Sequence, residues 1–110
     1  KLFYDLQKYH PKAWLSFKAF KEKNLGKCIL LNLERGISEG YYRSEIKTDI
    51  LAQMRLEQVD LLFSQHNHYT TNTYSLVQVM TEITEHFLYG VCNPKGLEKI
   101  NHYKQQATQP

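Results

Sequence analysis

Histidine and glutamate come closest to forming a catalytic or metal-binding pattern in this sequence. The run HNH places His66 and His68 two residues apart in a polar segment, and no further metal ligand accompanies them. The run TEITEHF places Glu82 one helical turn before His86, whereas a zinc protease needs two histidines one turn apart with a glutamate between them. We expect no metal site at HNH, and an ion pair at a surface or interface for Glu82 and His86.

The sequence also lacks the common nucleophile and phosphate-binding motifs. It contains no G-x-S-x-G, P-loop or G-x-G-x-x-G pattern. Cys28 and Cys92 lie far apart without a CxxC pairing, which predicts reduced, buried thiols in a cytoplasmic protein. No apolar run is long enough to span a bilayer. We therefore expect no enzymatic activity, no catalytic residue, no cofactor and no membrane partner.

Composition and charge describe an ordinary globular chain with a surplus of aromatic side chains. Its 110 residues suit one domain over residues 1–110, and 42% of them are hydrophobic. The net charge is +3, and four lysines between residues 18 and 27 cluster at helical spacing. A solvated helix face explains these lysines better than a phosphate-binding patch does. Eight tyrosines, five phenylalanines and one tryptophan predict an aromatic-rich core or pocket.

The elements that position these side chains are predicted to be helices. Only five glycines and three prolines occur, too few for the turns of an all-β protein of this size. Pro11 should end a first helix and open a long second one from residue 12 to about residue 39, which Gly26 could bend or break. Its apolar stripe is formed by Trp14, Phe17, Leu25, Cys28 and Ile29, widened by Ala13, Phe20 and Leu31.

The stretch NLERGISEGYYRSEI, residues 32–46, should contain the turn after this helix. Gly40 is expected to provide a left-handed C-cap, and Ser44 the N-cap of the next helix, with Glu45 in its first turn. Gly36 lies one turn before Gly40, so the pair bares a strip of backbone. We expect a neighbouring helix to approach that strip closely; the alternative is that Gly36 merely loosens the helix end.

Two further helical regions follow, the first of them apolar on two sides. Between residues 45 and 64 the first face is formed by Ile46, Ile50, Met54 and Leu61, and the second by Leu56, Val59 and Phe63. This pattern predicts a helix that runs through the middle of a bundle. Ser75 and Gln78 can form a capping box for a helix with a heptad seam of Leu76, Met80, Ile83, Phe87 and Gly90. Asn93 should cap a short last helix over residues 94–104, with Pro94 at its first position.

Three segments resemble the ligand-binding domain of TetR/AcrR-type transcriptional regulators. NLERGISEGYYRSEI is similar to a turn of that domain in which a G-I-x-x-G-like helix end precedes an aromatic residue, an arginine and usually an aspartate. Glu45 stands where the aspartate is usual. DLQKYHPKAW is similar to the junction between the linking helix and the core, and EHFLYGVCNPKG to the turn into the last helix, in a Bacteroidetes-like subgroup.

The resemblance implies an all-α antiparallel helical bundle that acts as the C-terminal regulatory domain of a repressor. Operator DNA would be bound only through an N-terminal helix-turn-helix domain, which is absent from these residues. In this family the last two long helices pair with their copies, so residues 76–91 and 94–104 should form a homodimer. The expected interface residues are Leu76, Val79, Met80, Ile83, His86, Phe87 and Gly90. The alternative is that the apolar seam of residues 76–87 faces only its own core.

The resemblance also implies a small apolar or aromatic effector that enters between the helices. The effector would favour one packing of the bundle and change the spacing of two tethered DNA-binding domains. The candidate pocket residues are Phe3, Trp14, Phe17, Met54, Phe63 and Phe87. A different class of function is a helical interaction module that binds proteins and no small molecule. A small helical enzyme is the weakest alternative, because it would need acids or histidines that converge in a cleft.

Overall fold

The described part of the chain is built from helices. The computed structural model describes residue 5, residues 8–64 and residues 67–108. Its helices are α2 (Pro11–Ser38), α3 (Thr48–Leu62), α4 (Leu76–Val91) and α5 (Pro94–Thr108). No strand occurs in these ranges, although Tyr42 and Cys92 form an isolated antiparallel bridge. The predicted all-α class is confirmed for these residues.

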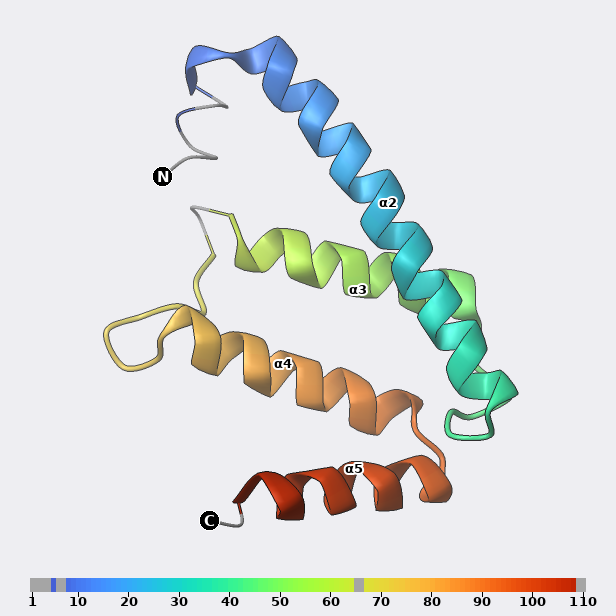
Figure 1. Cartoon of the computed structure of the whole chain (residues 1–110). Helices are drawn as coiled ribbons and strands as arrows, with labels where there is room; N and C mark the ends of the chain where they lie inside the picture. The colour runs from blue at the N-terminus through green and yellow to red at the C-terminus, as the bar shows by residue number, and fades with distance from the viewer. Residues whose placement is uncertain (1–4, 6–7, 65–66, 109–110) are drawn as a thin grey trace.

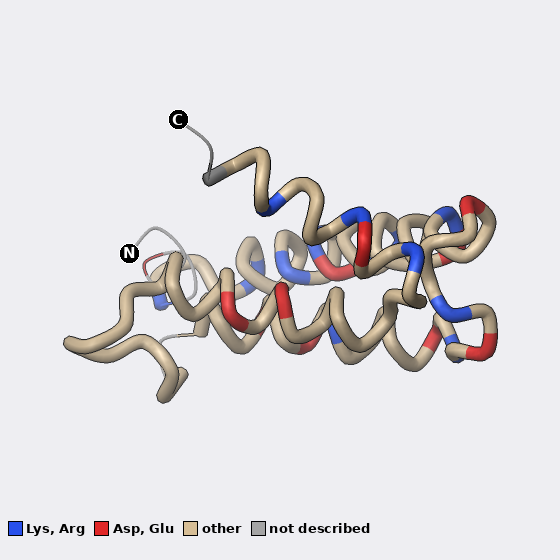
Figure 2. Tube along the Cα trace, turned by 90° about the horizontal axis from the view of Figure 1, so that it is seen from below, with Lys and Arg blue, Asp and Glu red and all other residues tan. Residues whose placement is uncertain are grey.

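The helices form an open assembly rather than a closed one. α3 packs against both α2 and α4, and α3, α4 and α5 reverse direction in succession (Figure 1). The first turns of α2 project away from the other helices (Figure 1). Within the described residues, α5 makes no comparably extensive contact with another helix. Figure 2 shows its C-terminal end leaving the layer formed by the others.

α2 is a single continuous helix of 28 residues, as its apolar periodicity predicts. It begins at Pro11, whose missing N–H costs nothing in a first turn. Gly26 does not break the helix. A Cβ at Gly26 would lie 3.6 Å from Cδ2 of Leu56, so this glycine lies where α3 comes close to α2. Farther along the same side, Leu33 is only 2% exposed.

The end of α2 matches the predicted C-cap but corrects the expected neighbour of Gly36. Gly40 has φ +81°, and its N–H donates to Ile37 O at 3.0 Å while the N–H of Tyr41 donates to Gly36 O at 2.9 Å. These are the two hydrogen bonds of a Schellman motif. The group that lies on Gly36 is the ring of Tyr42, which a Cβ would overlap. The expectation of a neighbouring helix there was wrong, because the chain folds back on its own helix end.

α3 begins later than predicted, and one of its two apolar faces is largely exposed. Its N-cap is Lys47, not Ser44, and Glu45 instead forms an ion pair with Arg43 at 2.9 Å. Ala52 and Leu62 are buried, whereas Ile50 is 63% exposed. Met54 and Leu61 on the same face are 40% and 45% exposed, whereas Ile46 packs against the core. α3 does lie between α2 and α4, but the prediction that both of its apolar faces are covered was wrong for the face around Ile50.

The two C-terminal helices carry the capping chemistry that their sequences predict. The Ser75 hydroxyl accepts from the N–H of Gln78 at 3.2 Å, and the Gln78 side chain accepts from the N–H of Ser75 at 2.8 Å. Asn93 Oδ1 accepts from the N–H of Gly96 at 2.8 Å, which caps α5. α5 is longer than the predicted 94–104, because the polar residues after Tyr103 continue the helix to Thr108.

The core is small and lies where α2, α3 and the end of α4 meet. Leu33, Ala52 and Val91 form its buried centre, with Phe87 and Tyr42 among the side chains packed around it. The radius of gyration is 16.5 Å, compared with about 13 Å for a compact domain of this length. Most of the large apolar side chains therefore lie outside a shared core.

The two cysteines, the loop before α4 and the apolar character of the helices complete the description of the fold. Cys92 is buried but Cys28 is exposed, so the prediction of two buried thiols was wrong for Cys28, which lies on the outer side of α2. In the loop before α4, Asn67 Oδ1 accepts from the N–H groups of Tyr69 and Thr70 at 3.1 and 2.9 Å. None of the described helices combines the length and apolar character needed to cross a membrane.

Candidate functional site

The best-defined contact between distant segments joins the α2–α3 turn to the α4–α5 turn. The N–H of Arg43 donates to Val91 O at 2.8 Å, and the N–H of Asn93 donates to Tyr41 O at 3.0 Å. The side chain of Asn93 donates to Gly40 O at 2.8 Å. We call this set of contacts, made by residues 36–43 with residues 90–96, the turn junction.

Glycine is required at position 96 because the backbones of the two turns approach closely there. A Cβ at Gly96 would overlap the carbonyl oxygen of Tyr41 and would lie 3.0 Å from Sγ of Cys92.

Burial raises the pKa of the Cys92 thiol, and burial together with the neighbouring Cys92 raises the pKa of Tyr42. Both groups are therefore held in their neutral forms.

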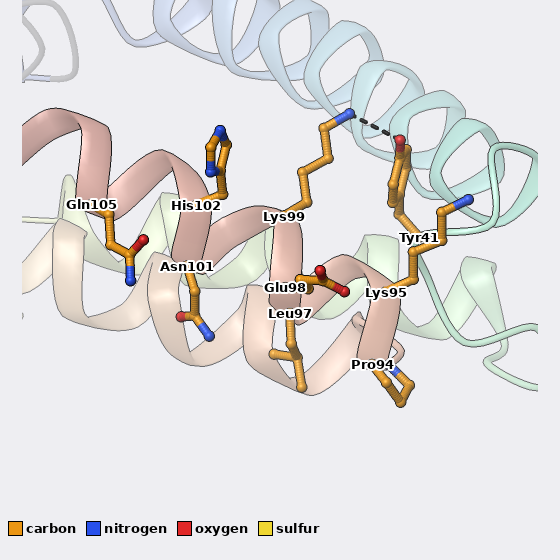
Figure 3. Close-up of a pocket in the computed structure, with 9 residues that line it drawn as sticks. All are labelled: Tyr41, Pro94, Lys95, Leu97, Glu98, Lys99, Asn101, His102 and Gln105. Carbon is orange, nitrogen blue, oxygen red and sulfur yellow. Dashed lines mark hydrogen bonds between the residues drawn. The ribbon is translucent and has the colours of Figure 1, made fainter.

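An open pocket of about 910 Å³ lies beside the turn junction on the outer side of α5 (Figure 3). Its lining residues are Tyr41, Pro94, Lys95, Leu97, Glu98, Lys99, Asn101, His102 and Gln105. Most of them are polar, so the pocket suits a hydrated, polar ligand better than the apolar effector that the sequence led us to expect.

Two lysines gather on the ring of Tyr41 at one end of this pocket. Lys99 Nζ donates to the Tyr41 hydroxyl at 3.0 Å and lies 4.2 Å from the ring centroid, and Lys95 Nζ lies 5.1 Å from it (Figure 3). The hydrogen bond to Tyr41 raises the pKa of Lys99. The pair keeps the first turns of α5 positively charged and attached to the α2–α3 turn.

The structure assigns little reactive chemistry to the described residues. No group of three or more histidine, cysteine or acidic side chains among them is placed to hold a metal ion. His66 of the HNH run lies outside the described residues, and His68 is exposed. Glu82 and His86 do not form the expected ion pair; instead Glu85 pairs with Lys104 of α5 at 3.0 Å.

The predicted effector-binding residues are spread over three helices and the turn after α3. Trp14 and Phe17 lie together, with ring centroids 6.3 Å apart. Phe87 is half-buried beneath the guanidinium of Arg55, which lies 5.4 Å from the ring centroid. Met54 and Phe63 are 40% and 46% exposed. Phe3 lies outside the described residues. A shared pocket for this set stays a prediction.

The predicted dimer residues occupy one broad side of α4, with different degrees of exposure. Val79 is buried, and His86 and Gly90 are exposed. The seam residues Leu76, Met80, Ile83 and Phe87 are half-buried. A Cβ at Gly90 would meet no atom within 4 Å. The side of α4 around Gly90 and His86 therefore has room for a second chain, and the interface stays a prediction.

Sequence reasoning missed the residues that build the turn junction and its pocket. Asn93 was recognised as a helix cap, but not as a donor to a carbonyl 53 residues earlier in the chain. Tyr41 and Lys99 gave no local signal, because their pairing depends on how two distant turns meet. Lys104, which bridges Glu85 and the hydroxyl of Tyr89 at 3.0 and 2.9 Å, was missed for the same reason.

Comparison with known proteins adds no relative to this description. No family model matches the chain, and no curated protein and no solved structure matches it significantly. The sequence motifs and the geometry of the described residues are therefore the grounds for a functional assignment.

Proposed function

We propose that the chain is the regulatory domain of a TetR/AcrR-type transcriptional repressor. In this proposal α4 and α5 pair with their copies in a homodimer, and a small apolar effector binds between the helices. The dimer would set the spacing of two helix-turn-helix domains on operator DNA. Three observations support the proposal: the resemblance of three sequence segments to that family, the all-helical fold, and the few contacts that α5 makes with the other helices.

The packing of α5 weakens steadily along the side that faces the molecule. Gly96 is buried, Ile100 is half-buried and Tyr103 is 58% exposed, although the three residues follow one another on the same side of the helix. Lys104 ties the far end of α5 to α4, through Glu85 and Tyr89. An apolar helix side that is left open in this way suits coverage by a second chain.

The observation that carries the proposal is the amount of surface left exposed. A compact monomer of 13.0 kDa exposes about 6,300 Å², whereas this chain exposes 8456 Å². The excess of roughly 2,000 Å² per chain corresponds to an interface within the range of obligate homodimers, about 2,000–5,000 Å² in total. A homodimer through α4 and α5 would bring the exposed area close to that of an ordinary globular protein.

Gly90 offers a direct test of the dimer. Because a side chain at Gly90 meets open space, Gly90→Trp should leave the fold of the subunit intact while obstructing a partner. We expect sedimentation equilibrium to give a homodimer for the unmodified chain and at least about tenfold weaker association for the variant. Val77→Trp is the matched control, because Val77 is 71% exposed on α4 and lies outside the predicted interface.

Two outcomes would overturn the proposed dimer. One is a monomer at the highest soluble concentration, with circular dichroism showing a folded helical chain. The other is equal association of the Gly90→Trp and Val77→Trp variants, which would mean that the interface lies elsewhere.

Effector binding separates this proposal from its runner-up, a helical protein-interaction module without a small ligand. A bound effector stabilises the native state, so some members of a panel of apolar and aromatic compounds should raise Tm. The same compounds should change the fluorescence of Trp14, the only tryptophan of the chain. A folded dimer that responds to no compound of the panel would favour the interaction module, which the exposed apolar side chains on α2 and α3 also suit.

A further inference from the structure

The side of α2 that points away from α3 carries large apolar side chains in water. Phe20 is 67% exposed and Leu31 is 54% exposed. These residues belong to a line that recurs every three or four positions, which we call the outer α2 stripe: Ala13, Phe17, Phe20, Asn24, Cys28 and Leu31. Because successive residues of an α-helix are rotated by about 100°, these six positions span only about 80° around the helix axis. Gly26 and Leu33, which mark the side toward α3 and the core, lie on the opposite side.

The charges next to the outer α2 stripe are of one sign. Residues 12–31 contain five lysines and one glutamate. Lys12, Lys23 and Lys27 are exposed along one edge of the stripe, and no carboxylate lies within ion-pairing distance of them in the described chain. The one acid, Glu22, lies on the opposite side, 4.0 Å from Lys18. The next acid on the helix, Glu34, comes after the stripe has ended.

The sequence alone allowed these lysines to be read as a solvated helix face, and the structure changes that interpretation. A solvated face explains exposed lysines, but it does not explain Phe20 and Leu31 beside them. Contiguous apolar surface bordered by charge marks an interaction site in soluble proteins. The stripe is about 27 Å long and straight, which matches the apolar side of a partner helix of similar length.

We propose that the outer α2 stripe docks an acidic amphipathic helix of a partner protein. Apolar side chains of the partner would cover Phe20 and Leu31, and its carboxylates would pair with Lys12, Lys23 and Lys27. Charge complementarity selects this partner over a basic one, because a basic helix would place like charges together along the edge. The docking site goes beyond the regulatory function proposed above, since it uses neither α4 nor α5 and shares only Phe17 with the predicted effector-binding residues.

Other occupants fit the observations less well. A second copy would have to offer an acidic apolar helix, and α4 is the best candidate, but Glu85 is already paired with Lys104 and Val79 is buried. Nucleic acid would use the lysines but would leave the apolar line uncovered. A membrane surface would use both features, and it is therefore one arm of the test.

The experiment uses two designed amphipathic peptides of about 20 residues, long enough to cover the stripe. Both present the same leucine side, and they differ only in carrying glutamates or lysines beside it. Each is labelled with fluorescein and titrated with the full chain. We expect saturable binding of the acidic peptide, measured by anisotropy, that weakens as salt rises. The basic peptide should not bind.

Matched variants assign the binding to the stripe. Phe20→Ser and the double variant Lys23→Glu/Lys27→Glu should each weaken binding of the acidic peptide at least about tenfold. Ile50→Ser is the apolar control, because Ile50 is 63% exposed on α3. Lys47→Glu is the charge control, because Lys47 is exposed at the N-cap of α3 and lies outside both the stripe and the pocket. Both controls should bind as the unmodified chain does, with unchanged helix content by circular dichroism.

Four results would overturn the docking site. The first is equal binding of the acidic and basic peptides, and the second is equal loss of binding in the stripe variants and their controls. The third is binding to phosphatidylserine vesicles without binding to the acidic peptide, which would indicate a membrane surface. The fourth is loss of the homodimer in Phe20→Ser, which would assign the stripe to a second copy. The Gly90→Trp result is independent of all four, so failure of this proposal and failure of the proposed dimer are distinguishable.

Discussion

The turn junction and the opposite end of the molecule differ sharply in how they are held. At the turn junction, Asn93 alone joins Gly40, Tyr41 and Gly96 through three hydrogen bonds of 2.8 to 3.0 Å. At the opposite end, the side chains of Phe20 and Tyr103 are 67% and 58% exposed, and α2 and α5, which carry them, lie far apart (Figure 1). One end is held by hydrogen bonds between distant segments, whereas the other makes few contacts within the described residues.

This difference teaches where the stability of the chain resides. Local opening is least costly where few apolar contacts are buried, so the first turns of α2 and the last turns of α5 should exchange their amide hydrogens fastest. The core around Leu33, Ala52 and Val91 lies close to the turn junction. Three experiments can break or sharpen the comparison, taken from the largest expected effect to the smallest.

Truncation of one leucine at each end should give the largest contrast. Leu33→Ala removes a side chain that is 2% exposed, and we expect the free energy of unfolding to fall by about 2–5 kcal/mol. Leu15→Ala, in the same helix but 64% exposed, should change it by less than about 0.5 kcal/mol. Urea denaturation followed by circular dichroism measures both. Equal losses would mean that the two ends are stabilised alike.

Alanine at two glycines of α2 tests the turn junction more finely. Gly36→Ala places a methyl group into the ring of Tyr42, and we expect a loss of about 1–3 kcal/mol from displacement of that ring. Gly26→Ala places its methyl group 3.6 Å from Leu56, an ordinary contact, and should gain up to about 1 kcal/mol from helix propensity.

A second substitution identifies the cause of the Gly36 effect. If the ring of Tyr42 is responsible, Gly36→Ala should cost much less in a Tyr42→Ala background. A cost that is unchanged in that background would contradict the packing of Tyr42 on Gly36.

The alkaline stability of the turn junction should show the smallest effect. Burial raises the native pKa of Tyr42 above the ordinary value of about 10, so folding favours the protonated phenol. This stabilisation is fully present below the unfolded pKa and is lost as the pH rises through the native pKa. The raised pKa of Cys92 acts in the same direction. Tyr42→Phe should therefore lose less stability than the unmodified chain between neutral and strongly alkaline pH.

Denaturation curves at a series of pH values measure this difference. At neutral pH the two proteins should be nearly equal in stability, because burial and Cys92, and no side-chain hydrogen bond, account for the raised pKa of Tyr42. A parallel decline of both proteins at alkaline pH would contradict a role for Tyr42.

Features that depend on neighbouring residues could be predicted from the sequence. Pro11 opens α2, Gly40 ends its last turn with a positive φ, and Ser75 with Gln78 caps α4. Each rests on a hydrogen bond or a steric rule that spans a few residues. The all-helical class followed from the same signals and from the scarcity of glycine and proline.

Features that depend on how distant segments meet could not be predicted. Ser44 has the chemistry of an N-cap, but Arg43 next to it is held by Val91 and Gly90 of α4, and α3 begins only at Thr48. The pocket beside the turn junction could not be predicted either, because it too depends on how the two distant turns meet. The periodicity of α3 predicted two covered faces, and this was wrong for the face around Ile50, because periodicity shows which positions are apolar and not whether a neighbour covers them.

The hydrogen bond from Asn93 to Gly40 has a consequence for how the molecule acquires its shape. It joins two residues that are 53 positions apart in the chain, and all of α3 and α4 must be accommodated between them. The search for that closure should dominate the folding time, whereas lengthening the segment between α3 and α4 should cost little, because doubling a flexible ring adds only about 0.6 kcal/mol. Evolution could therefore insert residues before Ser75 and still keep both turns in register.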